Sequence, residues 1–240
     1  MRAPEISSAL QGEDALLTRW NPDLLDDVLA PGISRFTEAN IPDLSSEFDQ
    51  STYWMSNHFL SSATGVRYSG RGRIHLVTAI LRAQLGFAAY HEARQASCEY
   101  LLGNNPLNPR VRKYFALVGE WETCVHNIHL FIDAFNLFAK PEKAYTTGDG
   151  SEEERFCLLS NDVKHLGRAA KEEHCIPMWL TNDGLVSLTS NVSYLEIAKL
   201  VRTMARFADL LQHPAGAVGY KPDTDPTLGE QGIGGIGIPP

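Results

Sequence analysis

The stretch that decides the fold is residues 73–102, which read RIHLVTAILRAQLGFAAYHEARQASCEYLL. Apolar residues recur along this stretch at helical spacing, and no proline interrupts it. Gly103-Asn104-Asn105-Pro106 follows, and these residues end a helix because glycine and proline both disfavour its continuation. The sequence therefore predicts one long helix over residues 73–102, preceded by a loop over residues 65–72.

A second long helix is predicted directly after this one. Asn108 has the side chain of an N-cap, and Pro109 suits the first helical position. The run continues to about Ala139, where Lys140-Pro141 ends it. Two long helices joined by a short connection favour an antiparallel hairpin.

Shorter helices are predicted on the N-terminal side of this hairpin. Apolar residues at helical spacing indicate helices over residues 12–30 and 43–63, and Pro31-Gly32 ends the first of them. We expect the second helix to contribute these side chains to the core: Leu44, Phe48, Trp54, Met55, Phe59 and Leu60.

The C-terminal half contains two capping signals and one strand signal. Two pairs of residues have the spacing of a capping box, Ser151 with Glu154 and Ser193 with Glu196. They predict a helix over residues 152–174 and a last amphipathic helix that ends at about Gln212. Between them, residues 176–189 indicate a β-hairpin with its turn at Asn182-Asp183-Gly184.

These elements define the predicted fold class and domain organisation. We expect a mainly α protein, an up-and-down helical bundle with one small β-hairpin before the last helix. The bundle forms a single domain over residues 1–214. Residues 215–240 are a Gly/Pro-rich C-terminal tail, which we expect to be extended or mobile because its glycines and prolines cannot support a helix.

Composition limits the classes of function. Of the 240 residues, 43% are hydrophobic and 21% charged, as in ordinary globular domains. The net charge of −8 disfavours non-specific binding to nucleic acid or to anionic lipid. The four cysteines lack metal-site spacing, which predicts reduced core thiols. Without a signal peptide or an apolar run of membrane-spanning length, we expect a cytoplasmic protein with no membrane partner.

The first candidate site is a polar stripe on the second long helix. Its members are Glu122, His126, His129 and Asp133. Their spacings of four, three and four place them on one helical face, and Glu and His one turn apart can bind one metal ion. Neutral imidazole suits zinc or iron, but the Glu-x-x-His motif of di-iron bundles is absent. The alternative interpretation is a solvated or hydrogen-bonded polar edge, and no particular cofactor is implied.

The second candidate site lies in the helix predicted over residues 152–174. Asn161, His165 and Arg168 recur at helical spacing on the side opposite the apolar residues. Such a stripe faces either solvent or a partner subunit.

The segment Asn161–His165, the hairpin with Trp179 and the amphipathic last helix together resemble the HEPN superfamily of small helical bundles. That family has an Arg-x(4–6)-His motif, and its dimeric members cleave RNA without metal at the subunit interface. Aligned on Asn161 and His165, the family's arginine falls on Ser160, a departure that argues against nuclease activity. The Arg-x(4–6)-His spacing of the family also occurs between Arg168 and His174, which have five residues between them.

Three functions follow from these observations. The resemblance implies a homodimer that acts through RNA or protein partners, in bacterial defence for many members, with His165 and Asn161 as its site and Arg168 and His174 as secondary members. The stripe from Glu122 to Asp133 favours a metal-binding bundle enzyme. The isoleucines of the tail favour a non-enzymatic interaction protein.

Overall fold

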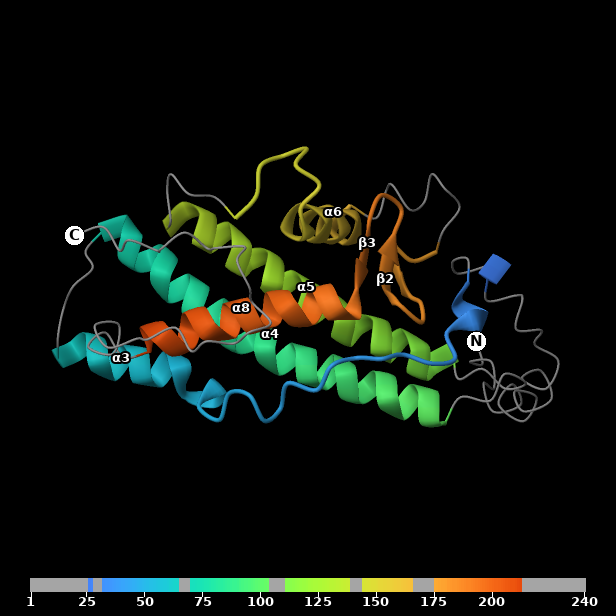
Figure 1. Cartoon of the computed structure of the whole chain (residues 1–240), viewed down its shortest axis with the longest axis horizontal. Helices are drawn as coiled ribbons and strands as arrows, with labels where there is room; N and C mark the ends of the chain where they lie inside the picture. Colours follow the sequence, from blue (N-terminus) through green and yellow to red (C-terminus); the bar gives the residue numbers. More distant parts are fainter. Residues whose placement is uncertain are drawn as a thin grey trace, which may run out of the picture.

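The structure is a computed structural model, and it describes residues 26–27, 32–64, 70–103, 111–138, 144–165 and 175–212. Two long helices, α4 (Gly70–Leu102) and α5 (Val111–Phe138), run antiparallel along the length of the molecule (Figure 1). The predicted hairpin is therefore confirmed. Helix α4 begins earlier than predicted, because Gly70 to Gly72 belong to its first turn and not to a loop.

Aromatic and polar contacts hold the two long helices together. The rings of Tyr100 and Tyr114 lie 5.7 Å apart, and the indole nitrogen of Trp121 donates a 3.0 Å hydrogen bond to Ser97. All of these side chains are buried. Because a buried indole N–H without a partner would cost free energy, the hydroxyl of Ser97 stabilises this packing.

Helix α8 (Tyr194–Leu211) lies against both long helices and completes the core (Figure 1). Ser193 and Glu196 form the complete capping box that the sequence predicted. At the opposite end of α8, the ring of Phe207 packs against Phe131 and Phe135, with both centroid distances 5.5 Å. The predicted last helix is confirmed.

The segment before α4 corrects one prediction. Residues 43–50 are not helical, and only η3 (Ser51–Tyr53) and α3 (Trp54–Thr64) are, after the short η2 (Ile33–Arg35). Contacts with α4 hold the start of this segment, since Tyr90 and Arg94 donate hydrogen bonds to the carbonyls of Pro42 and Ile41. Arg94 also pairs with Asp43, whose carboxylate in turn accepts from the N–H of Ser45 in a local turn. The core prediction for this region is also wrong in part, because Phe59 and Leu60 are exposed.

Helix α6 (Glu152–Lys164) packs on α5, next to a small antiparallel sheet (Figure 1). The helix ends at Lys164, whereas the prediction ran to residue 174, and residues 166–174 of that prediction lie outside the described residues. At His165 the backbone leaves helical geometry, with φ −108° and ψ 61°, and its N–H is shared between the carbonyls of Asn161 and Asp162. Such a tightened last turn is a common helix end.

The sheet comprises β1 (Met178–Leu180), β2 (Gly184–Ser187) and β3 (Asn191–Ser193), in the order β1-β2-β3. The predicted hairpin is confirmed, whereas β3 was not predicted. Gly184 is required where it stands, because an added Cβ would lie 2.2 Å from the carbonyl oxygen of Val192. The hydroxyl of Tyr114 on α5 accepts a hydrogen bond from the backbone N–H of Leu180, which joins the sheet to the bundle.

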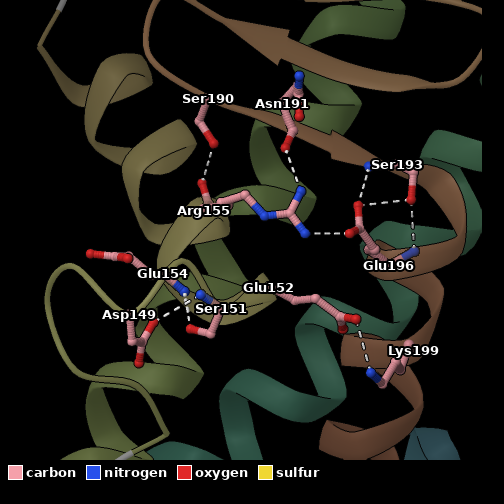
Figure 2. Close-up of polar contacts among 10 residues, drawn as sticks. All are labelled: Asp149, Ser151, Glu152, Glu154, Arg155, Ser190, Asn191, Ser193, Glu196 and Lys199. Atoms are coloured by element: carbon pink, nitrogen blue, oxygen red, sulfur yellow. Dashed lines mark hydrogen bonds and ion pairs between the residues drawn. The ribbon is translucent and has the colours of Figure 1, made fainter.

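The first turns of α6 and α8 are joined by ion pairs (Figure 2). Arg155 pairs with Glu196, and Lys199 lies 2.9 Å from Glu152. Half of the capping box predicted for α6 is present, since Ser151 accepts from the N–H of Glu154. The carboxylate of Glu154 instead accepts from backbone N–H groups of the loop before the helix.

Several predictions fall outside the described residues. They concern the helix over residues 12–30 except for Asp26 and Asp27, the N-cap at Asn108, and the tail over residues 215–240. Among the cysteines, Cys124 and Cys157 are buried as predicted, but Cys175 is exposed. No helix in the described part of the chain combines the length and the hydropathy needed to cross a membrane.

Candidate functional site

The polar stripe predicted on α5 is only partly exposed. His126 and Asp133 face solvent, Glu122 is half-buried, and His129 is buried. One contact joins members of the stripe, between His129 Nε2 and Asp133 Oδ2 at 3.2 Å. Within the described ranges, no three His, Cys, Asp or Glu side chains are grouped so that they could hold a metal ion.

His129 is held in its neutral form by its surroundings. Burial lowers its pKa, an effect that the carboxylate of Asp133 opposes. Its other ring nitrogen, Nδ1, is buried and has no hydrogen-bond partner among the described residues. A charged imidazole would need a partner at both nitrogens, so the neutral ring fits this position better.

The residues predicted on α6 differ in their exposure to solvent. Asn161, Lys164 and His165 are all exposed. Ser160 stands where the HEPN arginine would fall. This serine carries no charge and is 1% exposed, so the position offers neither a cation nor a surface to a ligand. Arg168 and His174 lie outside the described residues.

The two predicted sets are neighbours in space. Burial lowers the pKa of His126, and Lys164 of α6 and Arg82 of α4 lower it further. Lys164 also acts in the same direction on His129. Arg82 is held beside α5 by a 3.1 Å hydrogen bond that its Nη1 donates to the side-chain oxygen of Asn127. His126 therefore lies within electrostatic range of cations from two other helices.

Sequence reasoning missed two members of this site. Lys164 stands inside the motif that ends at His165, but its position on the side of the histidines of α5 follows only from the packing of α6. Arg82 had no signal, because it lies on a different helix and far from both sets along the sequence. We call the surface formed by these residues the α5–α6 face: Arg82, His126, His129, Asp133, Asn161, Lys164 and His165.

Asp162 does not belong to the α5–α6 face. Its carboxylate is 2% exposed and turns to the sheet, where it accepts hydrogen bonds from the hydroxyl of Ser187 at 2.7 Å and from Thr189 at 2.6 and 3.0 Å. The predicted motif from Asn161 to His165 is thus divided between a structural side and an exposed side.

The chemistry of the α5–α6 face is that of an anion site with a proton acceptor. Two cations attract negative charge, and a neutral histidine within their electrostatic range can take up a proton when an anion arrives. The carboxylate of Asp133 balances part of this positive charge. Comparison of the chain with models of protein families, with curated proteins and with solved structures finds no match.

Proposed function

We propose that the protein binds RNA through the α5–α6 face and acts on it as a HEPN-like helical bundle. The observation that carries the proposal is that Lys164 of α6 and Arg82 of α4 both lie within electrostatic range of the exposed His126, whose pKa burial lowers first and these two cations lower further. A phosphate group is attracted by two such cations. Its negative charge also stabilises a protonated histidine, so binding and proton uptake support each other.

Asn161 and His165 extend this site toward solvent. Both are exposed in the last turn and the C-cap of α6, next to Lys164 in the chain. Their side chains suit hydrogen bonds to the bases and the 2′-hydroxyl groups of single-stranded RNA. The small size of the cationic area, in a chain of net charge −8, favours a short single-stranded segment over a long duplex.

The same groups support a cleavage reaction. A neutral histidine can take the proton from a 2′-hydroxyl, whose oxygen then attacks the adjacent phosphorus. The bond from phosphorus to the 5′-oxygen then breaks. The histidine that has taken up the proton, or the ammonium group of Lys164, returns a proton to that leaving oxygen. Lys164 replaces the cation that the family's arginine supplies, since Ser160 cannot.

The metal-dependent alternative has less support. It requires several donors of the stripe on α5 to converge on one point, whereas the described contact is the single one between His129 and Asp133. The exposed side chain of His126 lies within electrostatic range of Lys164 and Arg82, and these cations oppose a bound metal cation.

The test measures binding of fluorescently labelled single-stranded RNA with a metal chelator present. We expect Lys164→Ala to weaken binding and to reduce the slope of log affinity against log salt concentration by about 0.7, because one phosphate contact is lost. Lys113→Ala is the matched control, since it removes the same charge from an exposed position near the start of α5. We expect this control to bind as the wild type does.

Three results would contradict the proposal. They are the absence of binding by the wild type, an equal loss in the Lys164→Ala and Lys113→Ala variants, and an unchanged salt slope in Lys164→Ala. Gel analysis of the same mixtures tests cleavage, which we expect His126→Ala to abolish because it removes the proton acceptor. Light scattering of the purified protein tests the homodimer that the HEPN resemblance implies.

A further inference from the structure

An apolar groove lies at the other end of the bundle, between α3 and the start of α4. Its volume is about 320 Å³, and the side chains that line it are Met55, His58, Phe59, Arg73, Ile74, Val77 and Thr78. Phe59 is 66% exposed, Ile74 63%, and the neighbouring Leu60 64%. No element in the described part of the chain covers these side chains. Exposed apolar side chains grouped in this way mark a surface that binds another segment.

We propose that the chain's own C-terminal segment, residues 213–240, covers this groove through Ile233, Ile236 and Ile238. The first support is where the described chain stops. His58, which lines the groove, donates a 3.0 Å hydrogen bond from Nδ1 to the carbonyl of Leu211. Asn57 donates a 2.8 Å hydrogen bond to the side chain of Gln212. The described end of α8 at Leu211 and Gln212 therefore lies beside the groove.

The second support is the length of the intervening chain. Residues 213–232 join Gln212 to Ile233, and a chain of this length spans about 25 Å on average. Helix α3 is about 16 Å long at its eleven residues. The isoleucines therefore reach the groove without movement of any described element. A tether of this kind raises the local concentration to about the millimolar range, so weak contacts are sufficient.

The third support is charge. The segment contains Asp223, Asp225 and Glu230 against the single Lys221, which gives it a net charge of −2, from three acidic residues and one basic residue. Arg73 lies in the groove, is exposed, and has no ion pair with another described residue. The segment thus matches the groove in both apolar character and charge.

The experiment is photo-crosslinking in the full chain. A photoreactive phenylalanine derivative replaces Phe59 in one variant and Leu195 in a control, whose side chain is equally exposed at 67% but lies on the first turn of α8. We expect position 59 to form crosslinks within one chain to residues 213–240, identified by mass spectrometry. Position 195 should not form them.

Further substitutions in the same full chain change the isoleucines of the tail or the cation of the groove. The substitutions Ile233→Ser, Ile236→Ser and Ile238→Ser together should abolish the crosslink from position 59, and Arg73→Glu should lower its yield. Equal yields from positions 59 and 195 would overturn the proposal. So would a crosslink from position 59 to a second copy of the chain, which would make that copy the occupant.

Discussion

The two sides of α6 use polar residues in opposite ways. On the side of the sheet, Asp162 is buried and accepts three hydrogen bonds from Ser187 and Thr189. On the side of α5, Lys164 lies near two histidines whose pKa values are lowered, and one of their ring nitrogens has no described partner. Satisfied polar groups hold a fold together, whereas groups under electrostatic strain are typical of binding and catalytic sites.

Removal of the Asp162 carboxylate should have the largest effect on stability of the changes considered on either side of α6. We expect Asp162→Ala to lower the free energy of unfolding by about 3 kcal/mol, because buried donors of Ser187 and Thr189 lose a charged acceptor. Urea unfolding measures the change. Asn161→Ala, at the neighbouring exposed position, is the control and should change stability by less than about 0.5 kcal/mol. If Asp162→Ala changed the free energy of unfolding as little as Asn161→Ala is expected to, the structural role of Asp162 would be contradicted.

The sheet that Asp162 supports gives the next largest effect. We expect Gly184→Ala to lower the free energy of unfolding by about 2 kcal/mol, because the new methyl group would overlap the backbone of Val192. Gly119→Ala is the control, since nothing lies within 4 Å of a Cβ at that position on α5. This control should stabilise the helix by up to about 1 kcal/mol. A Gly184→Ala protein as stable as the wild type would contradict the close approach of β2 and β3.

The histidines of α5 that face α6 should change the stability of the protein less, and only as the pH falls. Burial, the largest cause, and nearby cations lower the pKa values of His126 and His129 below the ordinary 6.5. The unfolded chain therefore binds protons that the folded protein resists, so their contribution to stability is present above pH 6.5 and is lost as pH falls from 6.5 through the lowered values. We expect the melting temperature to fall by a few degrees between pH 7.5 and pH 5.5.

The variant His126→Gln/His129→Gln isolates these two residues. Its own stability at pH 7.5 serves as its reference, so only the dependence on pH is compared with the wild type. We expect a weaker dependence than in the wild type, although His91, whose pKa is also lowered by burial, retains part of it. An identical dependence in both proteins would assign the effect to other groups.

Local signals in the sequence predicted much of the fold. Helical periodicity and capping residues identified the α4–α5 hairpin and the last helix, because both depend on neighbours along the chain. The turns of residues 43–50 could not be predicted, because the contacts of Tyr90 and Arg94 with the carbonyls of Pro42 and Ile41, just before them, come from another helix. Strand β3 is three residues long and has no pattern that distinguishes it from a loop.

The candidate site was predicted in pieces. The stripe on α5 and the motif on α6 both carried chemical signals, but nothing in the sequence placed Lys164 near His126. That proximity depends on how α6 packs on α5, and the contribution of Arg82 depends on the register of α4 against α5. Such long-range geometry becomes visible only in the folded chain.

The most direct test of the α5–α6 face is an NMR titration of His126 in the wild type and in Lys164→Ala. We predict a pKa below 6.5 in the wild type and a higher one in the variant, because a neighbouring cation is removed. Addition of a short single-stranded RNA should raise the wild-type pKa. An ordinary pKa in both proteins, unmoved by RNA, would contradict the account.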